Sequence, residues 1–60
     1  MQRLTVKMVW NQFQHLWFMM NNDNDRFLMH FPDCENIRKY FEGLDETKPK
    51  KYIITIDRIN

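Results

Sequence analysis

A single cysteine, Cys34, is the only thiol in this chain of 60 residues, so no internal disulfide can hold the fold together. A chain of this length buries about 60% of the surface that its unfolded form exposes, and one core of this size contributes roughly 3–5 kcal/mol. Stability must therefore come from how well the apolar side chains pack. We expect one small domain, residues 1–60.

The composition narrows the class of protein. Hydrophobic residues make up 43% of the chain and aromatic residues 15%, which is far more than disordered chains carry. The chain contains no Ser and no Ala, which excludes a serine nucleophile and argues against a helical bundle. The longest apolar run spans only residues 16–20, so we expect no membrane span and no leader segment. One unpaired cysteine fits a reducing compartment, which predicts a cytoplasmic location, in the host cell if the protein is viral.

An alternating pattern opens the chain. Residues 3–10 place Leu4, Val6, Met8 and Trp10 on one side and polar residues on the other, which predicts a half-buried strand. Residues 12–20 fit either an amphipathic helix or a strand, and their aromatic enrichment favours the strand.

Five consecutive Asn and Asp residues, Asn21–Asp25, predict a tight turn, and residues 26–31 alternate again, so the two flanking segments form a hairpin. A five-residue loop would place Met20 opposite Arg26. Because opposite residues share a face, Phe27 would then lie on the face of Trp17.

A short amphipathic helix is predicted after Pro32. Asp33 is the expected N-cap and Gly43 the expected C′ residue. The apolar stripe of this helix consists of Ile37, Tyr40, Phe41 and Leu44. Two ion pairs are expected on its solvent side, Glu35–Lys39 and Arg38–Glu42.

A charged loop over Asp45–Lys51 precedes a last strand, Tyr52–Ile59, with Ile54 and Ile56 on one face and Ile53 and Thr55 on the other. The predicted fold class is α+β, a small antiparallel sheet of three to four strands with one helix packed on one face, in the order β-β-β-α-β.

The surplus of aromatic and Met side chains is the main functional signal, because protein interfaces are enriched in these residues. We expect a non-enzymatic protein, without a cofactor, that binds a protein partner through an aromatic apolar surface, and we expect a homodimer. The predicted partner-binding residues are Trp17, Phe18, Met20, Leu28 and Tyr40.

The sequence also bears on four other functions: thiol catalysis, zinc binding, single-stranded nucleic-acid binding and a purely structural role. A thiolate at Cys34 is disfavoured by its acidic neighbours Asp33 and Glu35, and the spacing of Cys34, His15 and His30 matches no closed zinc site. A single-stranded nucleic-acid-binding module would use the aromatic residues together with Lys48, Lys50 and Lys51, although the net charge of only +1 is low for that function. A purely structural homodimer is the remaining alternative.

The order of the predicted elements also suggests a family. From Leu16 to Asn60 the chain resembles the small phage-encoded uracil-DNA glycosylase inhibitors of the Bacillus podovirus type. The turn Asn21–Asp25 is similar to their acidic hairpin turn, and Ile54–Asn60 is similar to their closing strand. The resemblance implies a phage-like protein that inhibits an enzyme of its host, such as a uracil-DNA glycosylase or another DNA-processing or defence enzyme. It also implies a dimer with an apolar pocket that receives the DNA-intercalating loop of the glycosylase. This chain lacks the acidic composition of that family and has an extra N-terminal strand, so no functional residue is carried over.

Overall fold

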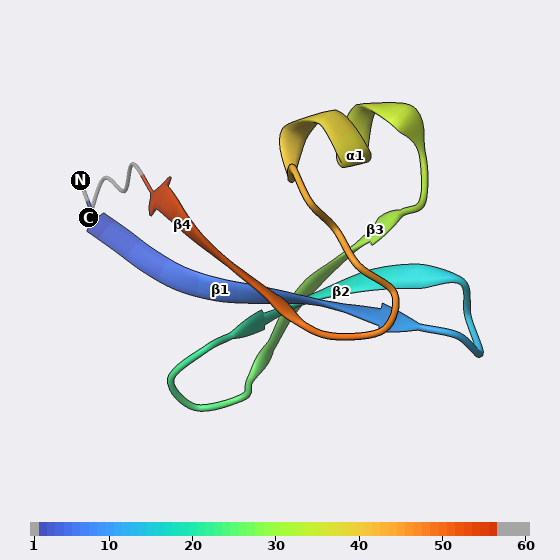
Figure 1. Cartoon of the computed structure of the whole chain (residues 1–60). Helices are drawn as coiled ribbons and strands as arrows, with labels where there is room; N and C mark the ends of the chain where they lie inside the picture. The colour runs from blue at the N-terminus through green and yellow to red at the C-terminus, as the bar shows by residue number, and fades with distance from the viewer. Residues whose placement is uncertain (1, 57–60) are drawn as a thin grey trace.

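A computed structural model describes residues 2–56 of the chain as a four-stranded antiparallel sheet with one short helix (Figure 1). The strands lie in the order β3-β2-β1-β4. The elements are β1 (Gln2–Asn11), β2 (Leu16–Asn21), β3 (Phe27–Pro32), α1 (Glu35–Tyr40) and β4 (Lys50–Ile56). The predicted α+β class and the antiparallel sheet are confirmed.

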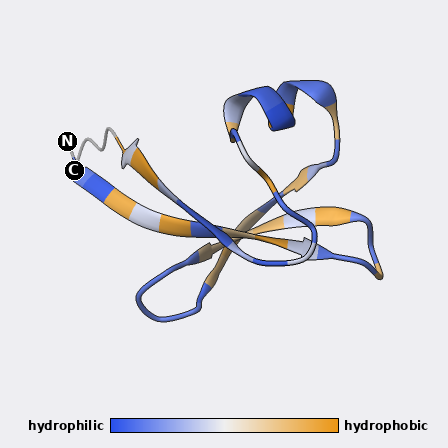
Figure 2. Cartoon of the chain, in the orientation of Figure 1, coloured by the Kyte–Doolittle hydropathy of each residue, from blue (hydrophilic) through white to orange (hydrophobic). Residues whose placement is uncertain are grey.

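The centre of the sheet is β1, which pairs with β2 on one side and β4 on the other. The predicted alternation in β1 holds, since Val6 and Met8 are fully buried. Met8 lies opposite Met19, and Val6 lies opposite Tyr52, so these side chains share one face, called here the front face. Figure 2 shows the same alternation of apolar and polar residues along the strands. The buried core consists of Val6, Met8, Trp17, Met19 and Phe41.

The segment expected as one strand over residues 12–20 is interrupted, because β2 begins only at Leu16. The Asn11 side-chain oxygen accepts hydrogen bonds from the backbone N–H groups of Phe13 and Gln14, both at 3.0 Å. His15 then adopts a left-handed conformation with φ of 55°. These local bonds compete with strand pairing and close a hairpin between β1 and β2, so residues 12–15 form neither a strand nor a helix.

The Asn/Asp turn between β2 and β3 is confirmed, but the predicted register after it is wrong. Met20 pairs with Phe27 and not with Arg26, while Met19 pairs with Met29. A β-bulge at this point gives β3 one extra residue. Phe27 therefore shares a face with Met20 and lies away from Trp17.

The apolar stripe predicts a helix that continues almost to the expected C′ residue, Gly43. The observed helix is shorter and ends at Tyr40. Its N-cap is Cys34, which makes no side-chain capping hydrogen bond. The expected cap Asp33 has other partners, described below. After the helix, Phe41 enters the core, and Ile37 packs against it.

One of the two predicted helix ion pairs is present. Lys39 Nζ lies 3.2 Å from Glu35 Oε1. The predicted Arg38–Glu42 pair is replaced, because the Arg38 guanidinium reaches Glu46 at 2.7 Å and also binds Asp33.

The last strand, β4, begins at Lys50, two residues earlier than predicted, and is described as far as Ile56. The remainder of the predicted strand, residues 57–59, lies outside the described residues. Tyr52 and Ile54 lie opposite front-face residues of β1, while Ile53 lies opposite Thr5 on the other face. Among residues 2–56, no helix has the length and apolar character needed to cross a membrane.

Candidate partner-binding surface

The back face of the sheet, opposite the core, carries a group of apolar side chains that no core residue covers. Val9 pairs with Phe18, and Met20 pairs with Phe27, so these four residues lie together across β1, β2 and β3. The rings of Phe18 and Phe27 meet edge to face with centroids 5.0 Å apart. Phe27 is 50% exposed. With Phe13 these residues are called here the back-face patch: Val9, Phe13, Phe18, Met20 and Phe27.

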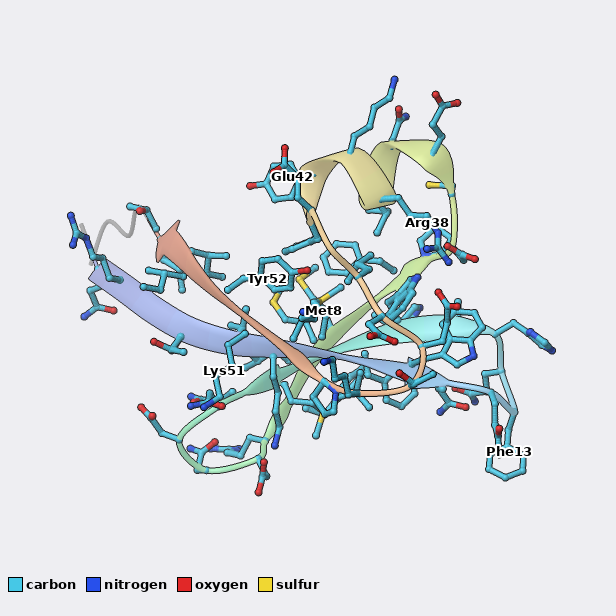
Figure 3. All side chains as sticks on the ribbon, viewed as in Figure 1. Met8, Phe13, Arg38, Glu42, Lys51 and Tyr52 are labelled. Atoms are coloured by element: carbon cyan, nitrogen blue, oxygen red, sulfur yellow. The ribbon has the colours of Figure 1, made fainter. Side chains whose placement is uncertain are left out.

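Phe13 extends the patch beyond the strands. It lies in the β1–β2 turn and is 86% exposed, the highest exposure among the large apolar residues within residues 2–56. It lines a hollow of about 300 Å³ together with Val9 and Phe18. Figure 3 shows Phe13 projecting from the turn, on the side of the sheet away from Tyr52. An exposed phenyl ring beside an apolar hollow has the character of an interface residue.

Cationic residues border the patch. Lys7 and Lys51 lie opposite each other on β1 and β4, on the back face, and Lys7 lies beside Met20 on its other side. The Lys7 ammonium group forms an ion pair with Asp25 of the β2–β3 turn. Figure 3 shows Lys51 extending from the sheet on the side away from Tyr52. The lysine cluster expected for nucleic acid is divided, because Lys50 pairs with Met8 of the front face.

The five predicted partner-binding residues do not form one surface. Trp17 is fully buried and belongs to the core, which corrects its expected place on the surface. Phe18 and Met20 lie half-buried on the back face. Leu28 is 41% exposed on the edge strand β3, at the bulge, and Tyr40 is 75% exposed on α1. Phe18 and Met20 share the back face, whereas Trp17 lies in the core and Tyr40 lies on α1.

Phe13 is the residue that sequence reasoning missed. Both patterns considered for residues 12–20 would have buried its ring in a strand or a helix. Asn11 could have indicated the exposure of Phe13. An Asn side chain that accepts hydrogen bonds from the backbone N–H groups two and three residues ahead starts a turn.

A polar cluster fixes the buried indole of Trp17. Its Nε1–H donates a hydrogen bond to Asp33 Oδ1 at 3.2 Å, and Arg38 Nε donates to the same oxygen at 2.8 Å. The Arg38 guanidinium also lies 5.5 Å from the centre of the indole ring. Arg38, and then the Trp17 indole, lower the pKa of the Asp33 carboxyl below its ordinary value of 3.8. The predicted helix cap thus anchors the core tryptophan instead.

The front face also carries an open apolar groove of about 430 Å³ beside α1. Its lining consists of Met19, Met29, Phe31, Asn36, Ile37, Tyr40, Phe41, Ile54 and Thr55. A second hollow lies next to it, where Tyr40 faces the edge strand β4. Tyr52 is fixed near this edge, because its hydroxyl donates a hydrogen bond to the Glu42 carbonyl at 2.7 Å. Partial burial and the nearby Glu42 raise the pKa of the Tyr52 hydroxyl.

The residues considered for metal or thiol chemistry are dispersed. Cys34 is exposed at the start of α1, His15 lies in the β1–β2 turn, and His30 lies on β3. The His30 ring stacks on Phe27 with centroids 6.4 Å apart, and the His15 ring meets Trp10 at 5.9 Å. Within residues 2–56, no three His, Cys, Asp or Glu side chains gather in a way that could hold a metal ion.

Comparisons with known proteins give no relative for this chain, since no family model, no curated protein and no solved structure matches it.

Proposed function

We propose that this protein is a non-enzymatic inhibitor that covers part of a host enzyme with the back-face patch. The observation that supports this most directly is the exposure of Phe13 and Phe27 beside the half-buried Phe18. Apolar anchors of this kind supply most of the energy of protein interfaces, and a true anchor contributes about 2 kcal/mol or more.

The border of the patch indicates the chemistry of the partner. Lys51 and Arg3 place positive charge on the back face, opposite Lys7 and Thr55, while the charge of Lys7 itself is paired with Asp25. A complementary partner surface would have an apolar centre with acidic side chains around it. Because exposed rim pairs contribute little and the aromatic centre supplies most of the binding energy, such binding would depend only weakly on ionic strength.

The resemblance to the phage inhibitors makes a uracil-DNA glycosylase the first enzyme to assay, with other DNA-processing or defence enzymes as alternatives. In this proposal the patch blocks an enzyme surface by steric occupation. It does not imitate the charge of DNA, since the patch is bordered by lysine.

The test compares immobilised wild-type protein with two variants for retention of proteins from a bacterial lysate. Phe18→Ala removes the central ring of the patch, and Tyr40→Ala removes a more exposed ring from α1, where it lines the front groove. We expect at least one enzyme to be retained by wild type and by Tyr40→Ala, with affinity reduced at least about tenfold for Phe18→Ala. The activity of that enzyme should fall in proportion to added wild-type protein.

Circular dichroism and melting temperature serve as the folding control for both variants. If every retained protein binds Phe18→Ala as well as wild type, the patch is not the binding surface. If the retained enzyme keeps full activity in the complex, inhibition is wrong even though binding is right.

A single-stranded nucleic-acid-binding function is the second candidate, and one observation favours it. The stacked rings of Phe27 and His30 share the back face with Lys7 and Lys51, which is the combination of platform and cation that such sites use. This function predicts oligonucleotide affinity that falls steeply between about 50 and about 200 mM salt. It also predicts strong loss in a Lys7→Gln, Lys51→Gln double variant, whereas Lys48 and Lys50 would matter less.

A further inference from the structure

The two outer strands of the sheet differ in how open they are to another strand. The edge strand β3 is bulged opposite β2 and ends at Pro32, and bulges and prolines are both features that block edge pairing. The edge strand β4 is regular along its pairing with β1, and its residues from Tyr52 to Ile56 are β-branched or aromatic. Within residues 2–56, no strand pairs with the outer side of β4.

The hydrogen-bond pattern identifies which groups of β4 point outward. The Asn22 N–H donates to the Thr5 carbonyl at 3.0 Å, so Thr5 directs its backbone groups toward β2. Because these directions alternate along an antiparallel strand, Val6 directs its groups toward β4 and bonds with Tyr52. The backbone groups of Lys51, Ile53 and Thr55 therefore point away from β1, toward the open edge.

We propose that this edge binds β4 of a second copy of the chain, in an antiparallel register centred on Ile53. Three requirements select this register. It pairs the outward-pointing residues with one another, Ile53 with Ile53 and Lys51 with Thr55, and each such pair exchanges two hydrogen bonds. It overlaps the strand along its full length, from Lys50 to Ile56. It also places no lysine opposite a lysine, which a register shifted toward Lys51 would do.

The side chains on both faces of β4 agree with this pairing. Ile53 is 70% exposed in a single copy, and the second Ile53 would cover it on the back face. On the front face Ile54 of the second copy would lie opposite Tyr52, next to the hollow that Tyr40, Tyr52 and Ile54 line. A two-fold pairing of like edges closes on itself, and the blocked β3 edges prevent growth into a fibre. The result is an eight-stranded dimer.

The experiment measures mass by sedimentation over a range of micromolar concentrations, for wild type and three variants. Wild type should have twice the 7.6 kDa mass of one chain. Ile53→Lys places two ammonium groups opposite each other and should give monomers. Leu28→Lys adds the same charge to an exposed position on the other edge strand and should remain dimeric. Thr55→Pro removes an outward-pointing N–H without affecting the bonds to β1, so it should also weaken the dimer.

Two further measurements make the outcome decisive. Mixing Ile53→Lys with Ile53→Glu should restore a dimer, because the opposed charges become complementary. In wild type the amide protons of Ile53 and Thr55 should exchange slowly, and more slowly as concentration rises. A monomeric wild type, a dimer that Leu28→Lys disrupts and Ile53→Lys does not, or rapid exchange of these amides in a dimer would each overturn the proposal. The last result would mean that another surface forms the dimer.

Discussion

At the scale of single residues, Asp33 shows how one side chain connects a strand, a helix and a loop. Its carboxylate accepts from the indole of the buried Trp17 and from Arg38, and Arg38 in turn reaches Glu46. The indole N–H would otherwise have no acceptor inside the core, and a buried donor without a partner is destabilising. Asp33 therefore stabilises the fold as the hydrogen-bond acceptor for Trp17 and does not serve as the helix cap.

We predict that Asp33→Ala lowers the melting temperature more than Asp33→Asn does. The Asn amide oxygen can still accept from Trp17, while Ala cannot, and both variants lose the ion pair with Arg38. Thermal unfolding followed by circular dichroism at neutral pH compares the two variants. Arg38→Gln is the matched control, because it removes the ion pair and keeps the acceptor. Equal melting temperatures for the Ala and Asn variants would show that the indole hydrogen bond contributes nothing.

Acid should weaken the fold through the same carboxyl group. The pKa of Asp33 is lowered in the folded protein, so its contribution to stability is complete above the ordinary value of 3.8 and is lost as the pH falls through the lower folded value. We predict that wild type loses more stability than Asp33→Asn when the pH is lowered from 5 to below 3.8. Urea unfolding across this pH range measures the difference, and parallel curves for the two proteins would contradict the prediction.

At the scale of elements, the connections are set by local backbone chemistry. The β1–β2 turn depends on Asn11 and on the left-handed His15, and the segment after α1 depends on Gly43, whose φ is 82°. Gly43 lies past the end of the helix and not at its C′ position, but its conformation is the one that only glycine adopts without strain.

We predict that Gly43→Ala destabilises the fold by about 1–2 kcal/mol, the typical cost of the left-handed conformation for a residue with a Cβ. No heavy atom lies within 4 Å of the position that this Cβ would occupy, so the effect would be conformational and not steric. Gly43→Asn should cost less, since Asn tolerates positive φ. Chemical denaturation of the three proteins measures the order, and a larger loss for Asn than for Ala would contradict it.

At the scale of the whole molecule, a thin core depends on its central strand. Met8 is fully buried, lies between Met19 and Lys50, and belongs to the stretch of β1 that pairs with β2 and β4 at once. Replacing a buried Met with Ala typically costs about 2–5 kcal/mol, which is comparable to the roughly 3–5 kcal/mol that a core of this size supplies.

We therefore predict that Met8→Ala is largely unfolded at room temperature, as seen in its far-ultraviolet circular dichroism and in amide exchange. Met29→Ala is the control, because Met29 is 47% exposed and its removal leaves little cavity. If Met8→Ala keeps a cooperative transition close to that of wild type, then the core is either larger or more able to collapse than its buried residues indicate.

The sequence alone determined the alternation of β1 and β4, the Asn/Asp turn and the α+β class, because alternation and turn chemistry act over a few residues. Only the tertiary structure decided which apolar residues are core. The bulge in β3 places Phe27 on the back face. The β1–β2 turn, which contains neither Gly nor Pro, leaves Phe13 exposed, and the pairing of β1 with β2 buries Trp17. Of the predicted partner-binding residues, Phe18 and Met20 are neighbours on the back face and Trp17 lies in the core, while a role in binding stays a prediction. Periodicity shows that two faces exist, but which one is covered depends on contacts between segments far apart in the chain.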